Sequence, residues 1–271
     1  MALTEFQRNI CKLIAGNRIA SGESYVAGGT ALGEATRSAR LSRDIGLFHD
    51  RVEAVDASWQ ADRALLEQHG YETDVIRERA GYVEAVVRVE SGEVLMQWTA
   101  DSAIRFFPLV EHAEFGLVLH PFDLATNKVL ALVGRLEARD WVDVIYCHQR
   151  IQRLGYLAWA ASSKDPAISP VKILEQAGRS ARYSKLELDT LDLEGPSPDA
   201  RVLSEQWHDI LEDAVDLVRL LPSEHVGLCV LGEQGELFNG DHTMLESALA
   251  SGDVRFHSGC LRGAYPNLVD S

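Results

Sequence analysis

The pattern of apolar and polar positions in the first half of the chain predicts a mixed sheet with helices. Apolar residues at helical spacing predict helices over residues 3–16 and 56–69, the second ended by a glycine. Short apolar runs predict strands at 24–27 and 45–48, with a further helix over 31–36 between them. Runs rich in β-branched and aromatic residues predict four more strands, at 71–78, 82–89, 94–98 and 117–120.

The character of the chain changes at Pro121. Helical spacing predicts helices over 122–133 and 139–153, and helices dominate as far as residue 221. The last fifty residues favour a hairpin between 226–231 and 236–238, a helix over 243–249 and a strand at 254–257. The sequence therefore predicts an α/β (α+β) fold in three parts: a mixed part over 1–120, a helical part over 121–221 and a small α+β tail over 222–271.

Composition narrows the function classes. The 271 residues are 46% hydrophobic and 25% charged, which is typical of a globular protein with a sizeable core. With a net charge of −15, the chain is not expected to have the broad basic surface of a duplex DNA binder. The four scattered cysteines form no zinc-type spacing, and there is neither a run of about 18 apolar residues nor a secretory signal at the start. A cytoplasmic protein with reduced thiols is the expectation.

Residues 28–48, GGTALGEATRSARLSRDIGLF, contain the strongest candidate site. A double glycine between a strand and a helix lets the backbone approach a phosphate closely, and the N–H groups at a helix start bind phosphate. Carboxylates two residues apart on a strand point to one face, where they can hold Mg²⁺. Asp44 opens the following strand, so the segment is typical of a phosphate and cation pocket.

Two blocks of the sequence resemble the AbiEii/AbiGii toxin family. That family's first pattern is GG-T-AL followed by R-x-S-x-DIDLF, and it is matched by Gly28, Gly29, Thr30, Ala31, Leu32, Arg40, Ser42, Asp44, Ile45, Leu47 and Phe48. The second is D-L-x-x-x-K-x-x-AL … R-x-x-x-RD-x-x-D, matched by Asp123, Lys128, Arg135, Arg139, Asp140 and Asp143. The two blocks cover roughly the first 150 residues, and the resemblance carries nothing beyond about Leu154.

The resemblance implies a polymerase β-like nucleotidyltransferase core over 1–120, with the helical part completing the active site. The implied reaction transfers a nucleotidyl group from an NTP such as ATP to tRNA or a protein, with Mg²⁺ as cofactor. The implied biological role is that of a toxin with a separate antitoxin as partner. The residues that the resemblance implicates in binding the nucleotide are Gly28, Gly29, Thr30, Ser42, Arg43 and Lys128. In the same way, Asp44 would hold Mg²⁺, and Asp143 would activate or orient the acceptor.

One position departs from the family pattern: Gly46 stands where the family has the second carboxylate of DID. Three explanations of this glycine are open. The chain is a weakened or inactive homologue, or it carries an inactivating change. Alternatively, another acid such as Asp101 or Glu84 completes the metal site. Asp101 follows the predicted strand at 94–98 and is our candidate second metal ligand, although Gln97 or Trp98 could occupy the equivalent place.

Gly46 also keeps a second function class open, an inactive module that binds a nucleotide or a partner without transfer. A third alternative is a kinase-like or aminoglycoside-type transferase on the same core.

Several candidate residues also have structural interpretations. Ser42 could bond locally, Arg43 could be solvated, and Asp140 could form an ion pair with Arg135 or Lys128. Aromatic residues at such spacing are more often core than a base-stacking platform, and this applies to Trp98, Phe106, Phe107 and Trp141. The histidines His49, His120 and His148 form no metal-binding spacing and are expected to be structural or surface residues.

Overall fold

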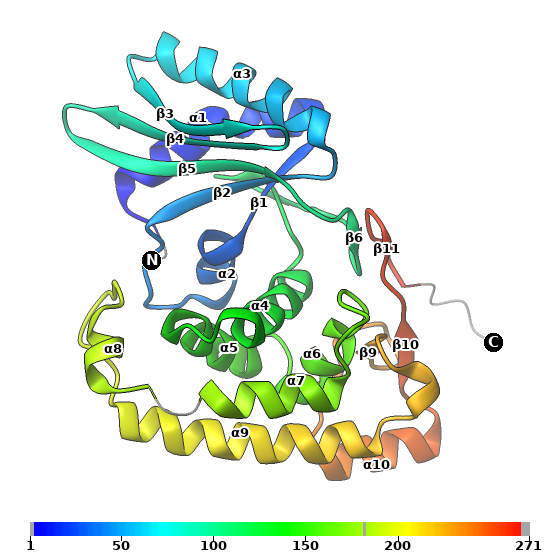
Figure 1. Cartoon of the computed structure of the whole chain (residues 1–271). Helices are drawn as coiled ribbons and strands as arrows, with labels where there is room; N and C mark the ends of the chain where they lie inside the picture. Colours follow the sequence, from blue (N-terminus) through cyan, green and yellow to red (C-terminus); the bar gives the residue numbers. More distant parts are fainter. Residues whose placement is uncertain (1–2, 181–182, 267–271) are drawn as a thin grey trace.

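The computed structural model describes residues 3–180 and 183–266, and in them the chain folds into a sheet-containing part and a helical part (Figure 1). The helices of the first part are α1 (Glu5–Ser21), α2 (Gly28–Thr36) and α3 (Val52–Gln68). Its strands are β1 (Ser24–Ala27), β2 (Asp44–His49), β3 (Glu72–Arg79), β4 (Tyr82–Val89), β5 (Gly92–Ala100), β6 (Ile104–Arg105), β7 (Val110–His112) and β8 (Gly116–Val118).

The second part is mostly helical. Its α-helices are α4 (Pro121–Arg135), α5 (Ala138–Arg150), α6 (Leu154–Ala161), α7 (Pro170–Ala177), α8 (Lys185–Asp189), α9 (Ala200–Leu220) and α10 (His242–Ser251). Three short strands accompany them: β9 (Cys229–Leu231), β10 (Arg255–His257) and β11 (Cys260–Leu261). Among the described residues, none of the helices combines the length and the apolar character that crossing a bilayer requires.

Seven strands form the central sheet, in the order β3-β4-β5-β2-β1-β8-β7. β2 pairs in parallel with β5 and antiparallel with β1, so it lies in the middle of the sheet. The helices α1 and α3 cover one face, while α2 lies on the other, between the sheet and the helical part (Figure 1).

The side chains of β2 alternate between these two faces. Ile45, Leu47 and His49 are buried, on the side that α3 covers. Asp44, Gly46 and Phe48 are half-buried on the opposite side, which faces α2 and the helical part. The period of two in a strand therefore places Asp44 in the space between the two parts of the molecule.

The mixed α/β class expected from the sequence is confirmed, since the chain contains a mixed sheet flanked by helices and small C-terminal sheets. The predicted hairpin between 226–231 and 236–238 forms as a short antiparallel turn, with a bridge between Leu231 and Leu237 and a hydrogen bond from Phe238 N to the carbonyl of Val230 at 3.1 Å. β9 also pairs antiparallel with β10, a pairing that the sequence did not predict. The last strand, β11, returns to the first part of the chain and pairs with β6.

Candidate functional site

The double glycine lies where β1 ends and α2 begins. Gly28 is exposed and has φ +68°, a conformation that residues with a Cβ rarely adopt. Ala27 is the N-cap of α2, and no side chain bonds to the first N–H groups of the helix there. An uncapped helix start with exposed backbone is suited to an anion such as a phosphate.

Glycine is needed at position 29 for a different structural reason. A Cβ at this position would lie 2.7 Å from Nη2 of Arg40 and 3.2 Å from the hydroxyl of Ser42. Arg40 is 8% exposed, so its guanidinium group has little room to move away. Glycine at position 29 therefore lets a buried arginine pass beneath the start of α2.

The hydroxyls of Thr30 and Ser42 are both used within the loop before β2. Thr30 Oγ1 donates to the carbonyl oxygen of Asp44 at 2.9 Å, and Ser42 Oγ approaches the same oxygen at 3.0 Å. Both residues are buried. These two hydroxyls hold the backbone at Asp44, and for Ser42 this is the local bonding that the sequence also suggested.

Five charged side chains join the loop before β2 to α4 and α5. Arg40 donates to both carboxylate oxygens of Asp143, at 2.8 Å each. Lys128 Nζ lies 2.8 Å from Asp140 Oδ1 and 3.1 Å from Asp143 Oδ2. Arg135 donates to Asp140 at 2.7 and 3.1 Å. Asp143 is thus held by two cations, and Asp140 makes both of the ion pairs that the sequence suggested.

The electrostatics of this network favour its charged form. Burial alone would raise the pKa of Asp140, but Lys128 and Arg135 hold the pKa of that carboxyl below its usual value. Burial likewise opposes the charge of Arg40, yet Asp143, Asp140 and Asp44 together raise its pKa. The ion pairs of this network join the helical part to the sheet-containing part.

One cavity, which we call the Gly28 cavity, lies between the start of α2 and the helix α4. It has a volume of about 370 Å³, and its lining includes Gly28, Phe48, Asp101, Lys128, Arg135 and Lys164. Lys128 and Arg135 come from the helical part, so the predicted phosphate turn and the predicted lysine line one cavity. Cations facing an uncapped helix start are a suitable environment for a polyphosphate.

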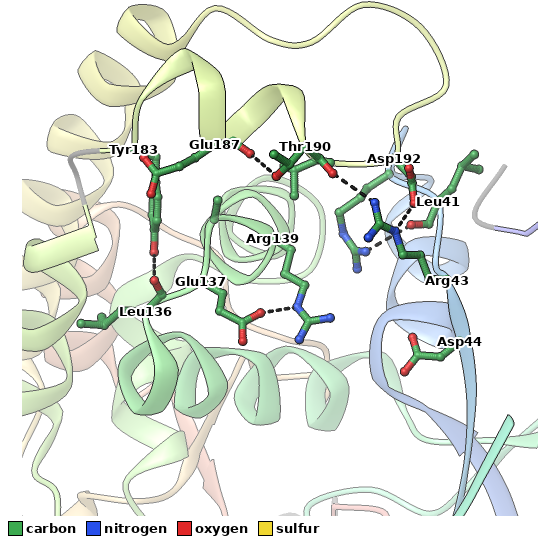
Figure 2. A pocket seen from close by; sticks show the side chains of 13 residues that line it. Leu41, Arg43, Asp44, Leu136, Glu137, Arg139, Tyr183, Glu187, Thr190 and Asp192 are labelled. Atoms are coloured by element: carbon green, nitrogen blue, oxygen red, sulfur yellow. Dashed lines mark hydrogen bonds and ion pairs between the residues drawn. The ribbon is translucent and has the colours of Figure 1, made fainter. Parts of the chain in front are cut away.

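A second cavity, the Asp44 cavity, has Asp44 in its lining and measures about 530 Å³, whereas Asp44 does not line the Gly28 cavity. Figure 2 shows Asp44, Arg43 and Arg139 around it, with Arg43 bound to the segment that follows α8. Arg43 is exposed and pairs with the carboxylate of Asp192. Asp44 also contributes to raising the pKa of Arg135, after Asp140 and Glu137 and against the effect of burial. Thr30, in the first turn of α2, bonds to the carbonyl of Asp44 at 2.9 Å, so Asp44 lies beside the start of that helix.

The structure does not bring Asp101 to Asp44. Asp44 pairs with Leu95 across the parallel strands, and Asp101 follows six residues later, which corresponds to about 20 Å. Two ligands of one Mg²⁺ each lie about 2.1 Å from the ion, so these two acids cannot share it. Among residues 3–180 and 183–266, no group of three His, Cys, Asp or Glu side chains is arranged to hold a metal ion.

Glu84, the other acid considered, is on the same sheet face as Gly46 but is already bonded. It accepts from Tyr82 OH at 3.1 Å and from Gln97 Nε2 at 2.9 Å, and Gln97 pairs with Gly46 across the strands. Of the three acids considered as metal ligands, Asp44 is thus the one that is neither distant from the predicted site nor already bonded as Glu84 is. The described residues do not fit the two-carboxylate clamp of the family pattern.

The space beside Gly46 is filled by an aromatic ring. A Cβ at position 46 would lie 2.7 Å from Cε2 of Phe48, because side chains two residues apart on a strand share a face. The ring also lies 3.9 Å from the place of a Cβ at Gly28. The space that a side chain at position 46 would enter is thus occupied by the ring of Phe48, which borders the Gly28 cavity.

Sequence reasoning missed Lys164, which lies just after α6 and outside any motif. Its Nζ lies 2.8 Å from both Asp123 Oδ1 and Asn127 Oδ1, and it lines the Gly28 cavity. Burial lowers the pKa of Lys164, and Asp123 partly offsets this.

The four aromatic residues considered as a stacking platform belong to the core: Trp98, Phe106, Phe107 and Trp141 are at most 5% exposed.

Comparison with solved structures identifies the fold. The chain is similar to MenT4, a nucleotidyltransferase toxin from Mycobacterium tuberculosis, with a TM-score of 0.54 at 16% sequence identity, over 81% of this chain and 83% of that one. JHP933 from Helicobacter pylori matches with a TM-score of 0.48 at 14% identity, over 80% of this chain and 95% of that one. No protein-family model and no curated protein matches the sequence. The chain has the nucleotidyltransferase fold expected from its two sequence blocks.

Proposed function

We propose that this protein is a nucleotidyltransferase that binds an NTP in the Gly28 cavity and transfers its nucleotidyl group to an acceptor. The observation that carries the proposal is the meeting of the uncapped start of α2 with Lys128 and Arg135 in one cavity, close to Asp44. The nucleotidyltransferase fold supports the same reaction class.

In the proposed reaction the triphosphate lies against the N–H groups at the start of α2. Lys128 and Arg135 balance the charge that grows on the departing pyrophosphate. The acceptor oxygen forms a bond to the α-phosphorus and releases its proton to solvent, while the bond from that phosphorus to the bridging oxygen breaks and pyrophosphate leaves. Mg²⁺ bound to the nucleotide would neutralise phosphate charge, and Asp44 offers it one carboxylate. Positioning and electrostatics would supply the rate enhancement.

In this proposal Asp143 has a different role from the one that the resemblance implied. Both of its oxygens accept from Arg40, and Lys128 lies 3.1 Å from Oδ2. A carboxylate bound in this way orients Lys128 toward the cavity instead of accepting a proton from the acceptor. The role we assign to Asp143 is therefore positioning.

The acceptor that we propose is tRNA or a protein, and the proposed biological role is that of a toxin in the cytoplasm, controlled by a cognate antitoxin. A structural relative, MenT4, is named a nucleotidyltransferase toxin. The test is incubation with each labelled NTP, Mg²⁺ and total cellular RNA, or total protein. Label in either acceptor fraction is the expected outcome, and no transfer with any NTP would contradict the proposal.

Asp44→Ala tests the cation role. We expect the variant to lose the metal-dependent part of NTP binding, because it removes the carboxylate offered to the ion. Calorimetry with and without Mg²⁺ measures this, and Asp56→Ala, an exposed acid on α3, is the matched control. Unchanged Mg²⁺-dependent binding in Asp44→Ala would rule the role out.

A second candidate function is an inactive module that binds a nucleotide or partner on this fold, and Gly46 favours it. Gly46→Asp separates the two, but a side chain there must displace the Phe48 ring. Gly46→Asp is therefore compared with Gly46→Asp combined with Phe48→Leu. Transfer that appears only in a variant identifies the natural chain as a weakened enzyme, and transfer in none of the three forms favours the binding module.

A further inference from the structure

Phe48 is placed differently from the other aromatic residues near the cleft. It is half-buried, and among the described residues that line the Gly28 cavity it is the single aromatic one. The aromatic residues that the sequence suggested for base stacking are all buried in the core. Phe48 is therefore the ring that a ligand in this cavity can reach.

The ring is supported from behind by a column of packed groups. The ring of Tyr25, 2% exposed, lies at 6.2 Å from that of Phe48 with an interplanar angle of 23°. The guanidinium of Arg105 lies 5.1 Å from the centre of the Tyr25 ring, and Asp50 accepts from it at 2.8 and 3.0 Å. Such a column restricts the motion of the Phe48 ring, which lowers the entropy lost when a ligand packs on it.

Gly46 makes this arrangement possible. Any side chain at position 46 begins with a Cβ that would lie 2.7 Å from the ring, which real Cβ atoms do not do. A glycine in the middle of a strand costs stability. The room that it leaves for the Phe48 ring is a physical reason for its presence here. Glycine at position 46 therefore has a structural role in addition to removing a carboxylate.

We propose that Phe48 is the platform on which the nucleoside part of the NTP packs, and that Gly46 is the positioning residue that seats its ring. This inference rests on the proposed NTP site. The start of α2 and the cations of the cavity would take the phosphates, and the ring would take the base or the sugar. Stacking on an aromatic ring accepts any base, so the platform predicts binding of all four NTPs.

The test compares nucleotides with a ligand that has phosphates but no nucleoside. Affinities for ATP, GTP, CTP, UTP and inorganic tripolyphosphate are measured by calorimetry for the full chain. Phe48→Leu should weaken each nucleotide about tenfold and change tripolyphosphate less than about twofold. Phe48→Tyr, which keeps the ring, should bind like the natural protein, and Phe6→Leu on α1 is the matched control.

Gly46→Ala gives an independent check, because its methyl group displaces the ring. It should weaken nucleotides as Phe48→Leu does, and the double variant should show no added loss. Equal weakening of tripolyphosphate and nucleotides by Phe48→Leu, or no weakening of either, would overturn the platform. If the natural protein binds neither ligand, the proposed NTP site itself fails, and the platform with it.

Discussion

At the residue scale, the site depends on buried charges that satisfy one another. Arg40 and Asp143 are 8% and 3% exposed and join the loop before β2 to α5. Removing one partner of a buried pair leaves the other charge without compensation, which costs far more than breaking an exposed pair. The same contact explains Gly29, whose missing side chain gives Arg40 its place.

Asp143→Asn tests this account. We expect the free energy of unfolding to fall by about 3 kcal/mol, because Arg40 and Lys128 lose a buried counter-charge. Urea unfolding measures it. Asp192→Asn, which removes the exposed partner of Arg43, is the matched control and should cost less than about 1 kcal/mol. Equal effects of the two substitutions would contradict a structural role for the buried pair.

Sequence reasoning identified the positions of the site better than their contacts. Gly28 and Lys128, which the family resemblance implicated in nucleotide binding, line one cavity. Contacts between distant segments leave no local pattern, so the bond from Thr30 to the Asp44 carbonyl was not foreseen, whereas local bonding of Ser42 was. Lys164 was missed for the same reason, since a single lysine after a helix carries no signal.

At the element scale, most helices and strands of the first part follow from hydrophobic periodicity. The predicted strand at 82–89 is β4, and the helix predicted over 56–69 ends one residue beyond the last residue of α3. The exceptions are the shortest strands. β6 and β11 have two residues each and pair with one another across the chain, so no alternation reveals them. The pairing of β9 with β10 was likewise not predicted, although the local hairpin contact of β9 was.

The end of α2 offers a test of local strain. Arg37 is the C-cap of this helix and has φ +49°, a left-handed conformation that favours glycine. Arg37→Gly should raise the free energy of unfolding by about 1 kcal/mol, because the strain on its Cβ disappears. Arg37→Ala keeps the Cβ and is the control. Equal stability of the two variants in urea would contradict the strain.

At the scale of the whole molecule, a chain of net charge −15 gathers cations in the space between its two parts. Lys128, Arg135 and Lys164 all line the Gly28 cavity. One acid, Asp101, lines the same cavity, so cations outnumber acids there. A cleft with an excess of positive charge can attract a polyphosphate even in an acidic protein.

Acid should destabilise the protein before its carboxylates titrate. Burial lowers the pKa of His49, His120 and His148, so the unfolded chain binds protons near pH 6.5 while the folded chain does not. The free energy of unfolding therefore falls as the pH drops below about 6.5. Urea midpoints at pH 7.5 and 5.5, at constant ionic strength, measure this.

His120→Asn isolates one of the three contributions. The ring nitrogen of His120 accepts from the N–H of Phe122 at the start of α4, and asparagine also accepts at such a position without titrating. The variant should therefore lose less stability between the two pH values than the natural protein. An equal loss would show that this histidine is not responsible.

The pairing of β11 with β6 sets a limit on how the chain can be divided. Arg262 N donates to the carbonyl of Ala103 at 2.7 Å, and His257 approaches the carbonyl of Phe106 at 2.8 Å. The final segment thus binds to the loop that follows β5 (Figure 1), and residues of this loop line the Gly28 cavity. A chain truncated before residue 255 would leave this loop without its edge partner. Affinity tags are accordingly better fused to the other end.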